Sequence, residues 1–400
     1  MRTSPAVAPI LLRMQLEKRQ PPLFPGAFPF LLHTRANRDT LICTRVQLQM
    51  KGQSMGQDSS RGSFVTAADI ARHVGVSRSA VSRTFTPGAS VSSEVRERVL
   101  EAAGELGYRV NRLARSLIHA KSNIVGLVGT DLNQPFHAEC LSALSIALLE
   151  DGFQCMLLNA ANAERHMGAL IERVLEYRVS AIVVMNGSPP SRIVKECIGS
   201  GVPVILVNKL MPGSAVDTVI TDHAAGGRAA AEQLLAAGCR QLAVVSSGAR
   251  TASLIGRMDA FRDLAAEAGV PVRVWQEGAT DYSTGRQAAL AMLGHDGIDG
   301  AFCVTDLIAL GFLDAARLDR GRRVPDDMSV IGFDDIPQAA WHSYQLTTFR
   351  QPVQLLTDQV MQIIQRRAET PDSPRAVFTL PATLVTRNTV RAPLATKGLT

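Results

Sequence analysis

The stretch that most constrains the fold of this 400-residue chain is Val65–Phe85, which reads VTAADIARHVGVSRSAVSRTF. Small or apolar residues stand at Ala71, Gly75 and Val81, four and then six positions apart. Ala71 permits close approach of two helices, Gly75 supplies the positive backbone angle of a tight turn, and Val81 packs between the helices. The spacing predicts a helix-turn-helix, whose second helix is of a size to enter a DNA major groove.

Capping residues mark where these helices begin. Thr66 precedes Asp69 by three positions, which is the spacing of a capping box, and Ser77 is placed to cap the second helix. Ser92 opens a third, amphipathic helix that ends at Gly107. The residues expected on its core side are Val95, Val99, Leu100, Ala103 and Leu106.

A short basic segment follows, RVNRLARSLIHAKSN at 109–123. It mixes polar residues with small or apolar ones, and this combination suits a helix that wedges an apolar side chain into a DNA minor groove. Its polar members are Asn111, Arg112 and Arg115, and its small or apolar members are Leu113, Ala114 and Leu117.

The net charge of +6 is unevenly distributed along the chain. Residues 1–62 carry nine basic and three acidic residues, and residues 63–122 carry nine and five. Residues 123–400 carry 24 basic and 28 acidic residues, a net of −4. A basic head on a mildly acidic body is typical of a protein that binds DNA at one end.

From Asn123 onward, short apolar runs alternate with longer helical segments over some 280 residues. This alternation indicates parallel sheets flanked by helices, and the length indicates two lobes. The expected strands are IVGLVGT, QCMLLN, AIVVMNG, PVILVN, LAVVSS, VRVW, AFCVT and SVIGFD.

Four motifs occur in one order along the chain: VTAADIARHVGVSRSAVSR, GYRVNRLARSL, NQPF, and VPDDMSVIGFDDIP followed by LTTFRQP. On these motifs, residues 64 to about 390 resemble a transcriptional regulator of the lactose-repressor family, also called the LacI/GalR family. The resemblance implies an all-α helix-turn-helix DNA-binding head and an α/β effector domain of two lobes, like a periplasmic binding protein. It also implies a cytoplasmic, nucleoid-associated protein that binds DNA as a homodimer and needs no cofactor.

The resemblance sets the expected domains. They are a head at 63–110, a hinge helix at 111–122, an effector-binding and dimerisation domain at 123–390, and a tail at 391–400. The first lobe is expected at 123–220 plus 352–390, and the second at 223–347. The chain is expected to cross between lobes near 221–223, near 333–338 and around 346–352.

By the same resemblance, Arg78–Phe85 is the recognition helix, with Arg78, Ser79 and Arg83 at base-reading positions. Arginine pairs bidentately with guanine, which predicts a G/C-containing half-site. The alternative for Arg78 is contact with phosphate alone. The phosphate-facing or supporting positions are Thr66, Ser77, Ser82, Tyr108 and Asn111; Ala114 and Leu117 belong to the hinge, with Leu117 as the residue that opens a central base step.

Ligands of parallel sheets bind beyond the carboxyl ends of the strands, so polar residues that follow strands are candidate effector contacts. Arg257 and Asp334 occupy positions that contact effector in several family members. Asp334 is alternatively a structural carboxylate and Arg257 half of an interlobe ion pair, whereas Phe136 either stacks on a ligand or fills the core. The full candidate set is Asp131, Phe136, Asn208, Thr251, Ser253, Arg257, Asp306 and Asp334. At Thr305–Asp306 the chain departs from many sugar-responsive relatives, which carry Asn there.

Two other classes of protein share such alternation: α/β enzymes and exported solute-binding proteins. The chain has no GxGxxG after its first strand, no GxxxxGK and no GxSxG, and its histidines have no evident partners in sequence. The six cysteines form no CxxC pair, so no metal site is predicted and they are expected to be buried thiols in a reducing compartment. A DNA-binding head without a secretory signal disfavours export.

Residues 1–62 resemble nothing in the family. We expect a misread start codon, with Met55 as the native first residue. The alternatives are a disordered basic arm and a targeting peptide.

The expected mechanism is linkage, in which a small-molecule effector changes DNA affinity by binding two conformations unequally. The operator of a dimer should be a pseudo-palindrome. Repression is the default expectation, and the sign of the effector's action stays open. The end of the chain, RAPLATKGLT, contains no heptad repeat, which favours a dimer over a tetramer.

Overall fold

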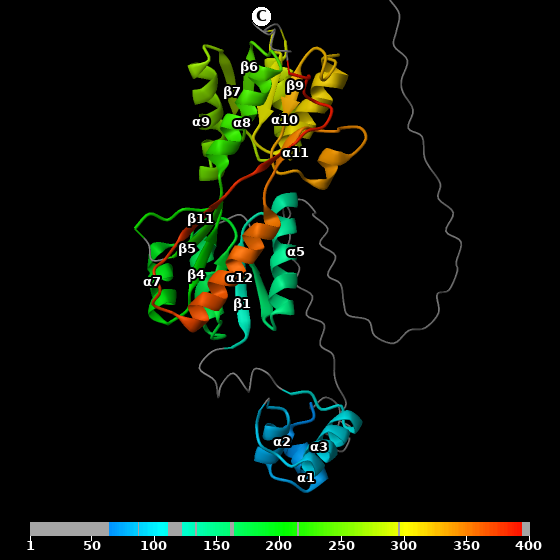
Figure 1. Ribbon diagram of the computed structural model, residues 1–400, viewed down its shortest axis with the longest axis vertical. Helices are drawn as coiled ribbons and strands as arrows, with labels where there is room; N and C mark the ends of the chain where they lie inside the picture. Colours follow the sequence, from blue (N-terminus) through cyan, green and yellow to red (C-terminus); the bar gives the residue numbers. More distant parts are fainter. Residues whose placement is uncertain are drawn as a thin grey trace, which may run out of the picture. The chain divides into compact units, whose positions relative to one another are not determined.

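The computed structural model describes residues 64–86, 88–110, 122–132, 134–160, 164–213, 216–294 and 297–393. Figure 1 gives the order of the elements along the chain. The expected leader, the hinge residues Asn111, Ala114 and Leu117, and Cys43 lie outside the described residues. None of the described helices combines the length and apolar character needed to cross a membrane.

The head consists of α1 (Ala67–Val74), α2 (Arg78–Thr84) and α3 (Ser93–Glu105). The capping box at α1 is present, because Asp69 N donates to Thr66 Oγ1 and Thr66 N donates to an Asp69 carboxylate oxygen 2.9 Å away. Ser77 Oγ accepts from Ala80 N and Ser92 Oγ accepts from Val95 N, so these two serines cap α2 and α3. Gly75 has φ +72°, the left-handed conformation that the tight turn requires.

A small core joins the three helices, formed by Ile70, Ala71, Val74, Val81, Val99, Ala102 and Ala103. The expectation that Leu100 and Leu106 lie on the core side is wrong, since their side chains are 49% and 36% exposed. Ala102 takes that position because α3 turns its small residues toward α1 and α2. Arg98 reinforces the packing by donating from Nη2 to Val74 O at 2.6 Å.

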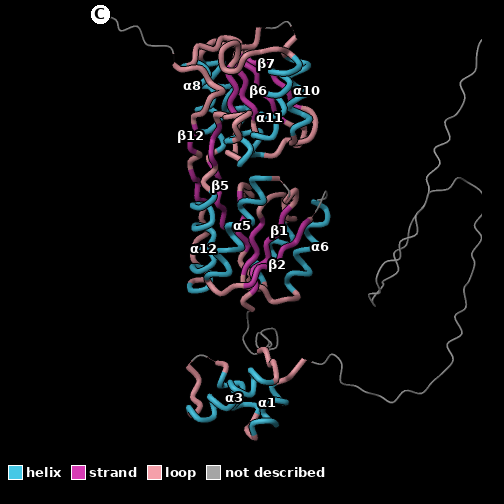
Figure 2. The backbone as a smooth tube through the Cα atoms, turned by 90° about the vertical axis from the view of Figure 1, so that its right-hand side faces the viewer, coloured by secondary structure: helices cyan, strands magenta, loops and turns pink. Residues whose placement is uncertain are grey.

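The first lobe is built on a parallel sheet with strand order β11-β5-β4-β3-β1-β2. Its strands are β1 (Ile124–Gly129), β2 (Gln154–Asn159), β3 (Ala181–Val184), β4 (Val204–Val207), β5 (Asp217–Thr221) and β11 (Val377–Leu380). Alternate residues of the central strands pack against α5 (Pro135–Glu150) and α12 (Val353–Glu369) on one face. The other face packs against α6 (Glu164–Leu175) and α7 (Ser191–Gly199). Figure 2 shows α12 and α6 on opposite sides of this sheet.

The second lobe repeats the scheme with strand order β7-β6-β8-β9, again all parallel. Its strands are β6 (Leu242–Ser246), β7 (Val272–Gln276), β8 (Gly300–Cys303) and β9 (Ser329–Ile331). Its helices are α8 (His223–Ala236), α9 (Ala252–Glu267), α10 (Tyr282–Met292) and α11 (Asp306–Asp314), with short helical turns at Ala315–Asp319 and Pro337–Ala340. The alternation of strands and helices predicted from the sequence is confirmed.

Glycines let the helices of the second lobe pack backbone to backbone. A Cβ built on Gly227 of α8 would lie 2.2 Å from Arg257 O of α9. Between α10 and α11, a Cβ on Gly285 would lie 1.8 Å from Ile308 O, and one on Gly311 would lie 1.9 Å from Tyr282 O. Any side chain at these positions would force the helices apart.

Three segments connect the lobes. The first runs from β5 through Asp222 into α8, and the second leaves β10 (Thr348–Arg350) and enters α12. The third leaves β11 and forms β12 (Thr383–Val385), which pairs antiparallel with β10. Thr389 then donates to Val330 O of the second lobe, so the chain has returned to that lobe before residue 390.

The expected crossing near 333–338 is wrong, because Phe333 and Ile336 are buried in the core of the second lobe. The third crossing lies instead between β11 and Thr389. The crossings expected near 221–223 and 346–352 lie where strands of one lobe lead into helices of the other.

Candidate DNA-binding face and ligand-binding edge

The second helix of the head presents a row of polar side chains to solvent. Ser77, Arg78, Ser79, Ser82 and Arg83 are all exposed. Neither arginine forms an ion pair within the described residues, so both guanidinium groups are available to an anion or a base edge. Such a row at the start of a helix after a tight turn has the chemistry needed to contact base edges and phosphates.

Other predicted DNA-binding residues support the head. Thr66 is engaged in capping α1 and has its hydroxyl 2.7 Å from an Asp69 carboxylate oxygen. The Tyr108 ring packs on Phe85 with 5.4 Å between centroids, which ties the end of the head to the end of α2. Ser77 Oγ lies 2.8 Å from Ser79 Oγ, so these two hydroxyls are paired before any DNA is bound.

Both sheets reverse their strand order at one point, which is where open parallel sheets bind ligands. In the first lobe this point lies between β1 and β3, and Thr130, Asp131 and Asn186 follow these strands. Thr130 N donates to Asn186 Oδ1 at 2.6 Å. Asp131 is exposed with φ +48°, and its carbonyl oxygen lies 3.1 Å from His137 Nδ1.

Gln134 joins this edge of the first lobe to the second. Its Nε2 donates to Thr280 O, 3.1 Å away in the second lobe. Phe136, one of the predicted contacts, is 8% exposed and packs in the core of the first lobe on β1 and β3. Its position favours the core-filling alternative over stacking on a ligand.

In the second lobe the reversal lies between β6 and β8, and Arg257 of α9 approaches it. Arg257 Nη1 donates to Val304 O at 2.6 Å and to Asp334 Oδ1 at 3.3 Å. Its Nε donates to His223 Nδ1 at 3.3 Å, and its guanidinium carbon lies 3.7 Å from the centroid of Phe333. The ion pair is buried, with 4% and 11% of the two side chains exposed.

Burial governs the ionisation of this cluster. Burial lowers the pKa of Arg257 and raises that of Asp334. The positive charge of Arg257 opposes part of the rise at Asp334, because it favours the carboxylate form. Burial, and then the neighbouring Arg257, lowers the pKa of His223 to about 2, so His223 is neutral. Burial and the charge of Asp334 raise the pKa of Asp306 to about 7.

Asp306 lies next to this ion pair but has no exposed surface. Its Oδ1 accepts from Thr348 Oγ1 at 2.6 Å and its Oδ2 accepts from Ile336 N at 2.9 Å. These bonds hold the turn after β9 to β10. Asp306 therefore supports the backbone next to Arg257 and Asp334, the predicted effector contacts, and is itself covered by other residues.

The backbone of that turn is strained. Asp334 and Asp335 have φ +125° and +57°, values that L-residues with side chains seldom adopt. Asp335 accepts from Arg350 Nε at 2.7 Å and from Arg387 Nη2 at 2.6 Å, so two arginines hold its carboxylate in place. The turn therefore fixes the Asp334 carboxylate against Arg257.

Gln351, at the second crossing, connects Asp334 with the first lobe. Its Nε2 donates to Asp334 Oδ1 at 2.7 Å. Its Oε1 accepts from Thr221 Oγ1 at 2.9 Å and from Asn208 Nδ2 at 3.4 Å. Asn208 Oδ1 also accepts from Thr221 N at 2.8 Å, so the predicted contact Asn208 is joined to Arg257 through Gln351 and Asp334.

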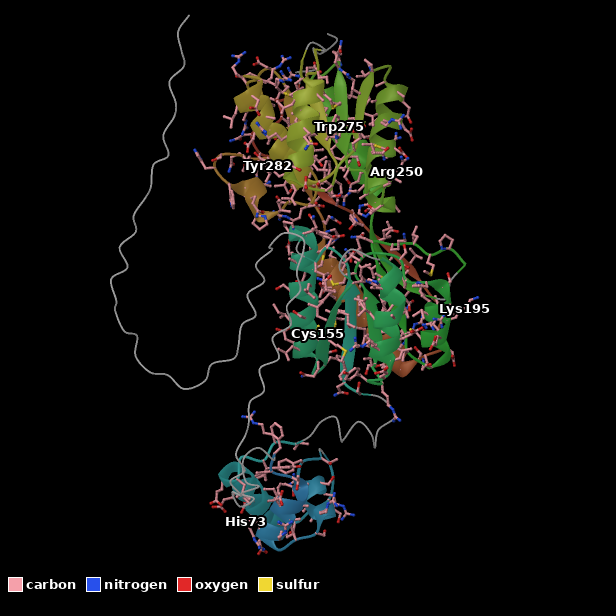
Figure 3. All side chains as sticks on the ribbon, turned by 180° about the vertical axis from the view of Figure 1, so that it is seen from behind. His73, Cys155, Lys195, Arg250, Trp275 and Tyr282 are labelled. Carbon is pink, nitrogen blue, oxygen red and sulfur yellow. The ribbon has the colours of Figure 1, made fainter. Side chains whose placement is uncertain are left out.

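Thr251 and Ser253 lie at the start of α9, six and four residues before Arg257. Thr251 is the N-cap residue, and its Oγ1 lies 3.0 Å from Ser253 Oγ. Figure 3 labels Arg250, which immediately precedes this cap. The Thr251 hydroxyl therefore caps the helix, and the Ser253 hydroxyl is paired with it.

The structure thus joins Arg257, Asp334, Asp306 and Asn208 in one network, and brings His223, Gln351 and Thr221 into it. The sequence offered no partner for His137 or His223, yet His137 borders Asp131 and His223 accepts from Arg257. The available signal was position, because His223 directly follows the polar residue that ends the first crossing. Within the described residues, no group of three or more His, Cys, Asp or Glu side chains could hold a metal ion.

Comparison with known proteins covers both parts of the chain. Residues 66–111 match the family model described as bacterial regulatory proteins, lacI family, and residues 231–390 match a periplasmic binding protein-like domain. GalS of Salmonella typhimurium is 30% identical over 296 residues, which are 72% of this chain and 86% of GalS. Catabolite control protein A of Priestia megaterium is 30% identical over 315 residues, 77% of this chain and 95% of the relative.

Solved structures share the fold. The Lac repressor dimer bound to operator and the anti-inducer ONPF has a TM-score of 0.75 at 24% identity, covering 82% of this chain and all of that chain. The complex of the transcriptional regulator CelR with cellobiose has a TM-score of 0.61 at 26% identity, covering 81% and 99%.

Proposed function

This chain belongs to the LacI family of bacterial regulatory proteins, and we propose that it is a repressor that binds a pseudo-palindromic operator as a homodimer. It is a DNA-binding transcriptional regulator with an effector domain, and not an enzyme. The observation that carries the proposal is the exposed polar row on α2, held by a capped helix-turn-helix within the segment that matches the family. The protein acts in the bacterial cytoplasm, on the nucleoid.

In this proposal Arg78, Ser79 and Arg83 read base edges. The two arginines favour guanine, while Ser79 specifies weakly because a hydroxyl pairs with several bases. Ser77, Ser82 and Thr66 face phosphates, and Tyr108 supports α2. A dimer places two such helices one DNA turn apart or a multiple of it.

The effector is a small molecule, a sugar or a related metabolite, that binds between the carboxyl edges of the two sheets. Arg257 and Asp334 provide a donor and an acceptor for it, and Asp131 is the exposed carboxylate on the first lobe. A relative of the same fold, CelR, is described in complex with cellobiose. Asn208, Thr251 and Ser253 border the same edge, and Asp306 and Phe136 support it from within.

Dimerisation uses the outer face of α5. Ile146 and Leu149 are 55% and 65% exposed there, and Leu355 at the start of α12 is 53% exposed. Ile146 also lines a groove of about 520 Å³ between α5 and α12. Leu157 of the edge strand β2 is 49% exposed. β2 also carries Cys155, which is exposed (Figure 3), so the expectation of buried thiols is wrong for this cysteine. Large exposed apolar side chains on contacting elements favour a protein partner, and a second copy satisfies a self-complementary interface.

Effector binding alters DNA affinity through the three connecting segments. A ligand that contacts both lobes favours one arrangement of them. It changes the affinity of the head for operator DNA only if the two arrangements of the lobes bind the operator unequally. Gln351 lies in one connecting segment and forms hydrogen bonds with residues of both lobes, so these bonds depend on how the lobes are arranged.

Mapping of genomic sites bound by the full chain tests the proposal. We expect a pseudo-palindromic sequence with G/C pairs in each half-site. Removal of residues 1–122 should abolish binding to that sequence and leave effector binding in place. A shortened protein that still bound the operator would contradict the assignment of the head.

A further inference from the structure

The C-terminal end of α2 is held by a side chain of α3. Arg96, in the first turn of α3, donates from Nη1 to Thr84 O at 2.8 Å. Its Nη2 donates to Ala89 O at 3.3 Å, in the loop that leads from α2 to α3. One planar guanidinium group therefore joins α2, this loop and α3.

The carbonyl group of Thr84 is the last one of α2. The last carbonyl groups of a helix have no N–H donor within the helix and need other partners. The two preceding carbonyl groups have local ones, because Thr86 Oγ1 donates to Ser82 O and Thr86 N donates to Arg83 O. Thr84 O instead accepts from a side chain twelve residues later. Within the described residues, no other hydrogen bond joins α3 to α2.

The two ends of α2 are therefore anchored separately. The first turn carries Arg78 and is capped by Ser77. The last turn carries Arg83 and ends at the carbonyl group that Arg96 holds. Of the two arginines predicted to read bases, Arg83 is the one whose backbone depends on Arg96.

Base reading by Arg83 depends on the direction of this last turn. Arg83 is exposed, so the backbone of the turn sets where its side chain begins and points. A bidentate contact with guanine needs the guanidinium plane in line with the base edge. Recognition groups must be held within about 0.5 Å and about 10–20° of the required geometry. A larger shift of the helix end would remove the pairing of Arg83 and leave that of Arg78.

We propose that Arg96 is a positioning residue for sequence recognition, whose bonds to Thr84 O and Ala89 O orient the last turn of α2 so that Arg83 pairs with its base. The inference rests on the proposed function and deepens it. Arg96 itself contacts no base. It acts only through the base pairs that Arg83 reads.

Arg98 provides a matched control on the same helix. Its Nη2 donates to Val74 O, the last carbonyl group of α1, at 2.6 Å. Arg96 and Arg98 thus each hold the end of one helix, but α1 carries no predicted base-reading residue. Arg96→Met and Arg98→Met remove the same donors and the same charge, so a difference between them measures the role of the end of α2.

Anisotropy titrations of the full chain on the mapped operator test the proposal. Each base pair is exchanged in turn in both half-sites, and discrimination at a position is the ratio of the two affinities. Arg83→Ala should lower discrimination about fivefold or more at the positions that Arg83 reads. Arg96→Met should lower it about threefold or more at the same positions, while Arg98→Met should stay within about twofold at every position.

Two further variants separate positioning from a general loss of stability. In the Arg83→Ala background, Arg96→Met should lower discrimination no further, because the residue through which it acts is gone. Arg96→Lys keeps the charge but lacks the planar fork that reaches both carbonyl groups, so its effect should be smaller than that of Arg96→Met. Affinity for nonspecific DNA, expected to equal that of Arg98→Met, shows that the head is folded.

Unchanged discrimination at the positions read by Arg83 would overturn the proposal, and so would an equal fall at every position. This holds for Arg96→Met, or for Arg96→Lys if Arg96→Met does not fold. If Arg83→Ala itself leaves every position unchanged, base reading by Arg83 in the proposed function is wrong, and the role of Arg96 is overturned with it. Loss confined to Arg96→Met and absent at the Arg83 positions isolates the failure to Arg96.

Discussion

The guanidinium carbon of Arg257 lies 3.7 Å from the centroid of the Phe333 ring, and both side chains are buried. The same guanidinium bonds to Asp334 and to the backbone of the strand end at Val304. One side chain thus ties α9 to β8 and to the strained turn after β9. Its loss should disturb both the fold and the proposed effector site.

Arg257→Leu should lower the free energy of unfolding by about 3 to 5 kcal/mol, because it leaves the Asp334 carboxylate buried without its cation. Urea unfolding followed by circular dichroism measures this. Arg228→Leu is the control, since Arg228 pairs with Glu267 at the surface, where solvent screens the pair and its loss should change stability little. Equal losses in the two variants would contradict the importance of the buried pair.

Asp306→Asn should change how stability depends on pH. Burial raises the pKa of Asp306 to about 7, so the fold favours its protonated form. The stability from this group is complete below pH about 4 and is lost as pH rises through 7. Asparagine mimics the neutral carboxyl, so the variant should be more stable than wild type at pH 8 and should approach it near pH 4.5.

Urea midpoints between pH 4.5 and 8.5 provide the measurement. Asp372→Asn, at an exposed carboxylate, is the control. Parallel curves for wild type and Asp306→Asn would show that Asp306 ionises as an ordinary carboxylate.

Arg78→Ala should reduce affinity for the matched operator by about 1 to 3 kcal/mol more than for an operator with the contacted G/C pair exchanged. The reason is that a bidentate contact discriminates among bases, whereas a phosphate contact does not. Anisotropy titrations at fixed salt measure both affinities. The control is Arg72→Ala, at an exposed arginine of α1 that pairs with Asp69. A uniform loss across sequences would assign Arg78 to phosphate.

Leu149→Glu should yield a folded monomer that binds operator weakly. Leu149 is 65% exposed in the single chain, so a charge there should cost the folded monomer little stability. In the proposed dimer the same charge would be buried against the partner, which disfavours association. Sedimentation velocity gives the oligomeric state. Val377→Glu, at a 58% exposed residue of the opposite edge strand, should leave the dimer intact. A dimeric Leu149→Glu protein would move the interface elsewhere.

Local patterns made the head predictable. Gly75, the capping box of Thr66 and Asp69, and buried Val81 each depend on neighbours within a few residues. The side of α3 that faces the core was harder to predict. Leu100 is more hydrophobic than Ala102, yet it is Ala102 that packs between the helices, while Leu100 is exposed.

Contacts between residues far apart along the chain could not be predicted from the sequence. Asp306 follows a strand and reads as a ligand contact, but Thr348, 42 residues later, takes one of its oxygens. The network of Gln351 joins Asn208, Thr221 and Asp334, which are up to 143 residues away from it along the chain. The third crossing was misplaced because the turn at Phe333 looks like a connection, and only the pairing of β12 with β10 shows where the chain returns.

The glycine contacts of the second lobe have a mechanical consequence. Gly285 packs against Ile308 and Gly311 packs against Tyr282, so the backbones of α10 and α11 are in direct contact there. No side chains lie between the two backbones at these points, which opposes sliding of one helix past the other. Gly227 locks α8 to α9 in the same way. We therefore expect each helix pair to move as one rigid unit, so that any rotation between the lobes is concentrated in the few residues at Asp222, at Gln351 and between β11 and β12.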